Sequence, residues 1–178
     1  MIKAKLVGDV QDRFQFGTDK FAVLNVHRPS GVIDVIYVRD PFELMEVGSR
    51  MKIEGEVVTR KYSRDTRKIW FVEPTNSQKA EDESQINYLT GWATLTDEPK
   101  LRQTPLGKTI AELAFNSAEN RCYLYAIAFG DYAKQVAATF KKGDKVKILK
   151  GRLQSRIYHQ DTNPEMINEM LLAEIQKI

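Results

Sequence analysis

The chain has 178 residues, with 27 Lys and Arg against 24 Asp and Glu and a net charge of +3 at pH 7. This length holds one large domain or two small ones, and no apolar run approaches the roughly 18 residues of a membrane-spanning helix. The small positive net charge is compatible with a polyanionic partner but is too small to indicate one. Cys122 is the only cysteine and the opening residues are too polar for a signal peptide, so we expect a soluble cytoplasmic protein.

The first half of the chain predicts a series of strands, because β-branched and aromatic residues alternate or run together between turn residues. The predicted strands cover residues 2–10, 21–27, 32–38, 51–62 and 69–72. Between the third and the fourth, residues 41–47 have room for one or two helical turns. Residues 75–85 contain almost nothing apolar and include three successive acids, which is typical of an exposed linker.

The second half repeats this order, with predicted strands at residues 87–95, 109–115, 122–129, 146–158 and 166–175. Tyr132, Val136 and Phe140 recur every four residues, which predicts a helix over residues 131–141. Asp131 is its expected N-cap, and Gly143 is expected to stop it. We therefore divide the chain into a first domain at residues 1–74, a linker at 75–85 and a second domain at 86–178.

One segment of the chain occurs twice. Residues 55–66 return ninety-six positions later as residues 151–162, with Gly, Arg, Tyr, Asp and Thr identical in place. A repeat with this spacing indicates two copies of a small domain. Three strands, a helical segment and two more strands, one of them long, is the order of the OB-fold, a five-stranded Greek-key barrel. We predict two tandem OB barrels, with Gly55 and Gly151 at the bend of the long strand, because an all-β sandwich leaves the helical segment unexplained.

Positive side chains beside aromatic rings recur where an OB barrel holds its ligand, on the second and third strands and the flanking loops. Single-stranded nucleic acid offers phosphates and flat bases, so a protein that binds it needs cations next to exposed rings. Each cation is alternatively a solvated edge residue, and each tyrosine a rim residue of the core. Trp70 is expected to point outward, because Ile69 and Phe71 then share the buried face. The predicted nucleic-acid-binding residues are Arg60, Tyr62, Arg64, Trp70, Arg102, Lys108, Tyr123, Phe129, Arg152, Arg156 and Tyr158.

The sequence offers no apparatus for catalysis. His27 and His159 lie in different halves, and Cys122 is distant from both, so these residues predict neither a metal site nor a nucleophile–base pair. No phosphate-cradling glycine motif is present, and the acids of residues 81–83 lie in the predicted linker. We expect no cofactor, no metal and no enzymatic activity.

Residues 89–116 resemble the opening of bacterial single-stranded DNA-binding proteins, and the likeness continues through residues 128–133, 142–144 and 151–158. The matching positions of the first stretch are Gly91, Pro99, Arg102, Thr104, Gly107, Ala114 and Asn116. This resemblance covers nearly all of the second domain, whereas the first matches only at residues 47–48 and 55–62. It implies OB barrels that bind single-stranded DNA with little sequence preference, with bases stacked on Tyr123, Phe129 and Tyr158.

The resemblance also implies an assembly of four OB barrels, hence a homodimer of this two-barrel chain. The chain stops at residue 178, just past its final predicted strand, so we do not expect the flexible acidic tail with which family members recruit enzymes. Such a protein would protect single strands in replication, recombination or repair. An OB-fold scaffold or primosome-type accessory that binds other proteins and touches DNA weakly stays open as an alternative, as does an RNA-binding OB protein.

Overall fold

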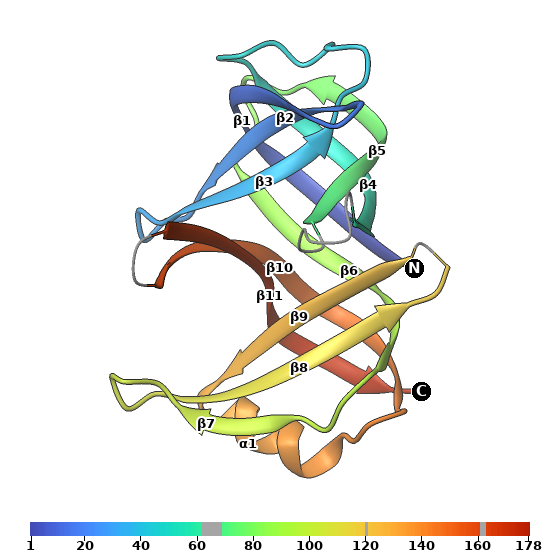
Figure 1. Ribbon diagram of the computed structural model, residues 1–178, viewed down its shortest axis with the longest axis vertical. Coiled ribbons are helices and arrows are strands. Elements are labelled where there is room, and N and C mark those ends of the chain that lie inside the picture. The colour runs from blue at the N-terminus through green and yellow to red at the C-terminus, as the bar shows by residue number, and fades with distance from the viewer. Residues whose placement is uncertain (62–68, 120, 161–162) are drawn as a thin grey trace.

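The computed structural model describes the backbone of residues 1–61, 69–119, 121–160 and 163–178, and the side chains of these residues except 156–160 and 163–167. It shows two β-barrels stacked along the long axis of the molecule (Figure 1). The first contains β1 (Ile2–Phe16), β2 (Asp19–His27), β3 (Ile33–Arg39), β4 (Arg50–Arg60) and β5 (Ile69–Lys79). The second contains β6 (Ile86–Leu95), β7 (Lys100–Gln103), β8 (Thr109–Ser117), β9 (Cys122–Phe129), α1 (Gly130–Thr139), β10 (Lys145–Gln160) and β11 (Asn163–Lys177).

Each barrel closes in the strand order of the OB-fold. In barrel one, β1 pairs with β2, β2 with β3, β3 with β5 in parallel, and β4 with both β5 and β1. In barrel two, the same pairings link β6, β8, β9, β11 and β10, again with one parallel pair, β9 with β11. The predicted fold of two tandem OB barrels is confirmed. The short β7, which pairs with β8 in the first loop of barrel two, was not predicted.

The long strands β4 and β10 carry the bulges that the repeated glycines predict. The pairing register shifts at Gly55 in the first and at Gly151 in the second. A Cβ atom at Gly55 would collide with the carbonyl oxygen of Glu73 and lie 2.9 Å from Cα of Pro74, and one at Gly151 would lie 2.8 Å from Sδ of Met170. At Gly55 only glycine allows the backbone of the neighbouring strand to approach this closely, whereas at Gly151 the close atoms belong to the flexible Met170 side chain.

The two barrels share one continuous sheet, because the first half of β1 pairs antiparallel with β6 from Ile2 opposite Gly91 to Val7 opposite Ile86. Ala4 lies opposite Gly55 in barrel one, and Leu89 lies opposite Gly151 in barrel two. These two equivalent residues also lie opposite each other, so an approximate two-fold axis passes between Ala4 and Leu89. The junction therefore has the geometry of an isologous dimer contact within a single chain.

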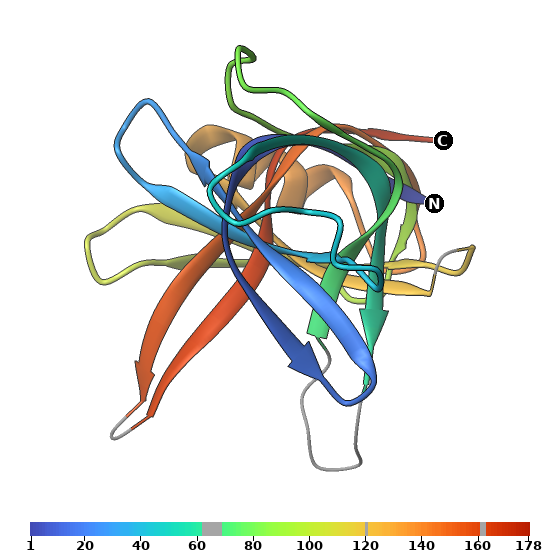
Figure 2. The same cartoon turned by 90° about the horizontal axis from the view of Figure 1, so that it is seen from above.

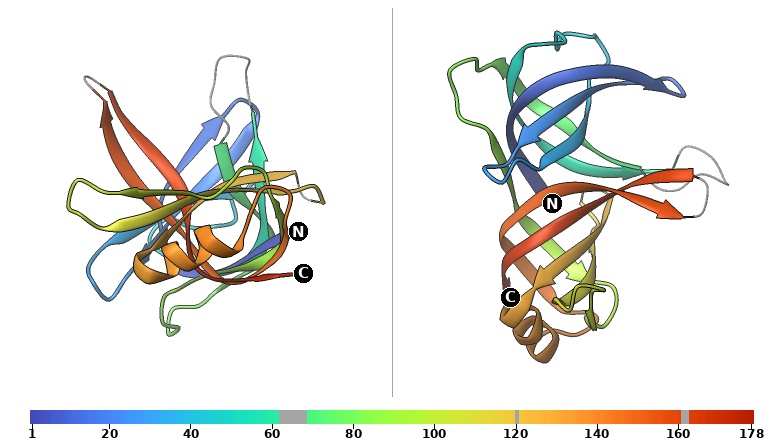
Figure 3. Two further views of the ribbon diagram at one scale, coloured as in Figure 1. Left: turned by 90° about the horizontal axis from the view of Figure 1, so that it is seen from below. Right: turned by 90° about the vertical axis from the view of Figure 1, so that its left-hand side faces the viewer.

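Side-chain contacts add to this junction. The hairpin of β10 and β11 rises from barrel two toward barrel one (Figure 3), where the Ser155 hydroxyl oxygen accepts the Val35 N–H of β3 at 2.7 Å. The Thr59 hydroxyl of β4 donates to the carbonyl of Tyr123 in β9 and accepts its N–H, both at 3.0 Å. The barrels are thus fixed to each other at several points, which a flexible tether would not provide.

The predicted linker at residues 75–85 is only partly a connection. Residues 75–79 continue β5, and residues 76–79 pair with β4, because backbone pairing does not require apolar side chains. The following segment is tied to barrel one, since Nζ of Lys52 lies 3.0 Å from Oε1 of Glu83 and the Arg50 guanidinium donates to the Glu83 carbonyl. The limits of the two domains stay a prediction.

The helical turns expected at residues 41–47 are absent, and the segment forms successive turns. The Asp40 carboxylate accepts the N–H groups of Leu44 and Met45 at 2.9 and 3.0 Å, and the Arg13 guanidinium donates to the carbonyl oxygens of Glu43 and Met45. Side chains therefore satisfy backbone groups that a helix would have paired internally. Glu43 also adopts a positive φ of 54°, which interrupts a helix.

The helix of barrel two forms, with ends that differ from the prediction. Phe129 is at the N-cap position and makes no side-chain cap, so Asp131 lies in the first turn and is not the N-cap. The helix ends at Thr139 with Phe140 as C-cap, and Gly143 adopts a φ of 88° in the turn before β10. Within the described residues, no helix is long and apolar enough to cross a membrane.

Candidate nucleic-acid interface

The outer face of β8 and β9 is the part of barrel two where an OB-fold holds its ligand. Side chains alternate across these strands, so Leu113 and Phe115 enter the core while the residues between them face outward. On β9 the outward residues are Tyr123, Tyr125 and Phe129, while Ile127, at the same spacing, is buried. The sequence pattern correctly predicts that Tyr123, Tyr125 and Phe129 lie on one face.

Two of these aromatic rings are open to solvent. The side chain of Tyr125 is 61% exposed and that of Phe129 is 42% exposed, whereas Tyr123 is half-buried. The rings of Tyr123 and Tyr125 meet edge to face with centroids 5.3 Å apart. A hydrogen bond with Tyr123 and partial burial raise the pKa of Tyr125, so this ring stays neutral at physiological pH and does not repel phosphate. The face therefore offers uncharged flat surfaces on which bases can stack.

A shallow cavity of about 290 Å³, here called the face groove, lies beside Tyr125. Its lining includes Ala114, Lys100, Glu112 and Glu169. Ala114 is directly opposite Tyr125 in the β8–β9 ladder, and its small side chain leaves the tyrosine ring uncovered. The groove is not uniformly positive, because Glu112 and Glu169 contribute carboxylates.

The positively charged side chains predicted for this region differ in whether they already form ion pairs within the protein. Nε of Arg102 on β7 lies 2.5 Å from Oε1 of Glu112, so an ion pair within the protein already uses part of its charge. Lys108, in the turn between β7 and β8, is exposed and forms no ion pair within the part of the chain that the structure describes. Lys100 is also exposed and lines the face groove. These side chains place positive charge along one edge of the aromatic face.

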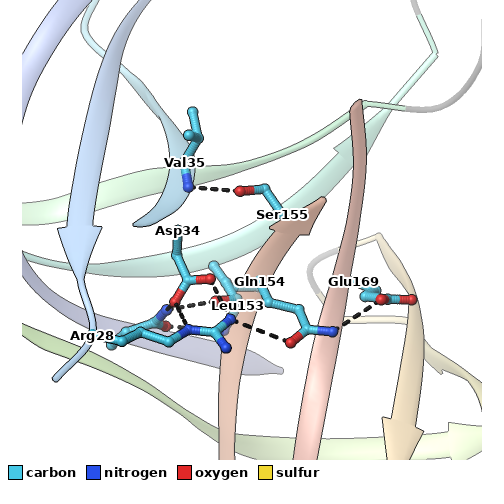
Figure 4. Close-up of polar contacts among 8 residues, drawn as sticks. Arg28, Asp34, Val35, Leu153, Gln154, Ser155 and Glu169 are labelled. Atoms are coloured by element: carbon cyan, nitrogen blue, oxygen red, sulfur yellow. Dashed lines mark hydrogen bonds and ion pairs between the residues drawn. The ribbon is translucent and has the colours of Figure 1, made fainter. Parts of the chain in front are cut away.

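A buried polar network connects barrel one to β10 next to this face (Figure 4). Arg28, in the turn after β2, donates from Nε and Nη2 to the fully buried carboxylate of Asp34, with 2.8 Å from Nε to Oδ2. Asn87 donates to the same carboxylate at 3.1 Å and accepts the N–H of Leu153 at 2.9 Å. Buried charges are tolerated when they are paired in this way.

The same network extends into barrel two. Nη2 of Arg28 donates to Oε1 of Gln154 at 3.3 Å, and Nε2 of Gln154 donates to Oε1 of Glu169 at 2.9 Å. Arg152, two residues before Gln154, remains outside it, because its Nε is buried and has no hydrogen-bond partner among the described residues. The network therefore fixes the position of Arg28 beside Arg152, a second arginine whose side chain has no hydrogen-bond partner among the described residues at its buried Nε.

The corresponding face of barrel one is occupied by contacts within the protein. The ring of Phe14 stacks on that of Phe21 with centroids 5.0 Å apart and meets that of Tyr37 at 4.8 Å. Arg60, a predicted binding residue, pairs with Asp19 at 2.6 Å from Nη1 to Oδ2, and its guanidinium lies 5.6 Å from the centroid of the Phe71 ring. Rings that pack on one another and cations that are already paired offer less to a nucleic acid than the face of barrel two.

The prediction that Trp70 points outward as a stacking platform is wrong. Its side chain is 6% exposed, and Nε1 donates to the carbonyl of Asn168 in β11 at 2.9 Å. Phe71 is fully buried as well, so both faces of β5 are covered at this point. Alternation predicted one buried and one open face, but the second barrel covers the face that would otherwise be open.

Four predicted residues fall beyond what the structure describes. Tyr62 and Arg64 lie outside the described residues, and Arg156 and Tyr158 lie in β10 where only the backbone is described. The hairpin that carries Arg156 and Tyr158 projects sideways from the barrels (Figure 2). Binding by the ten predicted residues other than Trp70 stays a prediction.

Sequence reasoning missed two residues at this interface. Tyr125 has the same odd spacing as Tyr123 and Phe129, and this spacing places it on the same face of the strand. Tyr125 is nevertheless missing from the predicted binding residues. Arg28 follows a strand of barrel one, and no local pattern links it to β10.

The geometry defines a class of protein, a tandem OB-fold protein with an aromatic, cation-edged face suited to unpaired nucleic acid. Residues 86–178 match the family described as "Single-strand binding protein family". This match covers more than half of the chain, so the protein belongs to the single-strand binding protein family.

Two solved structures of the single-stranded DNA binding protein from Thermus aquaticus are similar over the whole chain. A deletion mutant gives a TM-score of 0.78 and the wild type 0.76, each at 19% sequence identity. The similarity covers 100% of this chain and 94% and 93% of those chains, so the arrangement of two barrels is shared. No curated protein sequence matches the chain.

Proposed function

We propose that the protein binds single-stranded DNA across the outer face of β8 and β9, with bases stacked on Tyr125 and Phe129 and phosphates held by the neighbouring cations. The observation that carries this proposal is the pair of exposed rings on one face of β9, 61% and 42% open to solvent. Tyr123 supports Tyr125 from the side. The protein acts by binding and is not an enzyme, in keeping with its family, whose general role is to protect single strands in replication, recombination and repair.

Anisotropy of a fluorescent oligo-dT tests the proposal. The wild type should bind with an affinity that falls steeply as salt is added, because phosphate contacts release counterions. Tyr125→Ala should weaken binding by about 1–3 kcal/mol, the contribution of one stacked base, without changing the midpoint of thermal unfolding. Phe42→Ala is the matched control, since Phe42 is 80% exposed but lies in barrel one, away from this face. No binding by the wild type at low salt would overturn the proposal.

We also propose that two chains associate and so bring together four barrels. The outer face of the shared sheet exposes Tyr88, which lines one cavity with Lys3 and Lys5 of β1 and Glu54 and Glu56 of β4, and it also exposes Trp92, at 49%, farther along β6. Alternating signs of charge around an aromatic centre suit contact between two copies of one surface. Light scattering should give twice the mass of 20.4 kDa, and Trp92→Glu should return the protein to 20.4 kDa. A wild-type mass of 20.4 kDa at micromolar concentration would contradict the dimer.

The buried free thiol of Cys122 suits the reducing cytoplasm, which is where we propose that the protein works.

A further inference from the structure

A second cavity, of about 460 Å³, lies where the barrels meet and is here called the junction groove. Arg28 of barrel one lines it together with Lys108, Phe129 and Arg152 of barrel two. Phe129 is the last outward ring of β9, so the junction groove continues the aromatic face toward barrel one. The two barrels thus contribute side chains to a single depression.

Arg152 gives the junction groove a positive charge that no ion pair within the described residues neutralises. Within the described part of the chain its side chain forms no hydrogen bond or ion pair, and its Nε is buried. Burial and the nearby charge of Arg28 lower the pKa of Arg152, while Asp34 opposes them. The Asp34 carboxylate is already bonded to Arg28 and Asn87, so it compensates the charge of Arg152 only in part. A partly buried, unpaired guanidinium of this kind is stabilised by an anion.

The other side chains indicate which kind of anion fits. The exposed amine of Lys108 forms no ion pair with any described residue, and it lies with Arg152 in the lining of the groove. Arg28 uses Nε and Nη2 within the buried network, and Nη1 donates to no described residue. The half-open ring of Phe129 adds a flat apolar surface beside these cations. An anionic group attached to a flat ring satisfies both features, and each nucleotide of a single strand has this composition.

We propose that the junction groove is a nucleotide subsite, in which Arg152 and Lys108 bind a phosphodiester, Phe129 stacks on its base, and Arg28 provides a further donor. The proposal rests on single-stranded DNA as the ligand and adds a path for the strand. A strand bound on barrel two leaves it at the junction groove, where barrel one contacts it.

The salt dependence of oligo-dT binding tests this assignment, because each phosphate contact with a single strand contributes about 0.7 to the slope of log K against log [salt]. Arg152→Gln and Lys108→Gln should each weaken binding and reduce the slope by about 0.7. Arg152→Lys should restore the slope. Lys79→Gln removes one charge at an exposed site in barrel one, where Lys79 pairs with Glu46, and should leave the slope unchanged.

The outcomes separate the subsite from the function on which it rests. Wild-type binding together with unchanged slopes in Arg152→Gln and Lys108→Gln would overturn the subsite and leave DNA binding intact. No wild-type binding at low salt would instead overturn DNA binding itself. Arg152 is partly buried, so its variant is first compared with the wild type in thermal unfolding, whereas the exposed Lys108 keeps the test decisive if the Arg152 variant does not fold. Proton–nitrogen NMR adds a direct readout, since (dT)₄ should shift the Nε–Hε resonance of Arg152 and an unchanged resonance would contradict the contact.

Discussion

Replacing Trp70 by Phe should destabilise the protein without weakening its binding to DNA. The indole Nε1 donates to the carbonyl of Asn168 at 2.9 Å, and the side chain is 6% exposed, so the substitution removes a buried hydrogen bond between β5 and β11. Such a bond contributes about 1 kcal/mol. The smaller ring leaves roughly 40 Å³ unfilled, which at about 24 cal/mol per Å³ costs about 1 kcal/mol more. The expected loss in the free energy of unfolding is therefore about 2 kcal/mol.

Urea unfolding followed by circular dichroism measures this loss, and for a chain of this size it corresponds to a fall of about 4–8 °C in the midpoint of thermal unfolding. Phe42→Leu is the control, because an aromatic side chain that is 80% exposed and lies outside both proposed interfaces should cost below about 0.5 kcal/mol when it is replaced. The affinity of Trp70→Phe for oligo-dT should equal that of the wild type. A variant with wild-type stability and a tenfold loss of affinity would show that Trp70 stacks on DNA and that its assignment to the junction is wrong.

Three further changes probe the interior and the ion pairs. Burial raises the pKa of the Cys122 thiol to about 12. At pH 8 iodoacetamide should therefore modify this thiol roughly a thousandfold more slowly than an ordinary thiol, and the difference should disappear when urea unfolds the chain. Rapid labelling of the folded protein would contradict this prediction. A hydrogen bond and the charge of Arg50 lower the pKa of Asp9 below its ordinary 3.8, so Asp9 stabilises the fold above that pH and loses this effect as the pH falls through the lowered value. Asp9→Asn should therefore be less stable than the wild type at pH 7, and the difference should shrink as the pH falls below 3.8; a difference independent of pH would refute the assignment. Gly55→Ala should cost about 1–3 kcal/mol, because the new methyl group meets the carbonyl oxygen of Glu73, and an unchanged urea midpoint would mean that β5 moves freely.

Local sequence patterns were sufficient to predict the fold of each barrel. Strand alternation, the repeated segment and the glycines at 55 and 151 predict the barrel topology, because each depends on neighbours close in sequence or on a backbone that only glycine allows. The pattern also places Tyr123, Tyr125 and Phe129 on one face of β9, since side-chain direction in a strand has a period of two.

Features that depend on contacts between residues distant in sequence could not be predicted from local sequence patterns. Trp70 is buried because β11 covers it, although a strand of an isolated barrel would leave one side open. Arg28 reaches Gln154 of β10, which is 126 residues away in the sequence. Segment 41–47 is not helical because Arg13, distant in sequence, and Asp40 bind its backbone groups. In each case at least one partner is distant in sequence, and for segment 41–47 that partner is Arg13.

The ladder between β1 and β6 also determines what each half would do by itself. Equivalent residues of the two barrels face each other across this ladder. If the chain were cut between the barrels, each separate barrel would expose an unpaired strand edge, and this edge could pair with the same edge of a second copy. Two separate barrels would then associate only above a threshold concentration. The intact chain supplies the second edge at an effective concentration on the order of millimolar, which keeps the pair of barrels together even at high dilution.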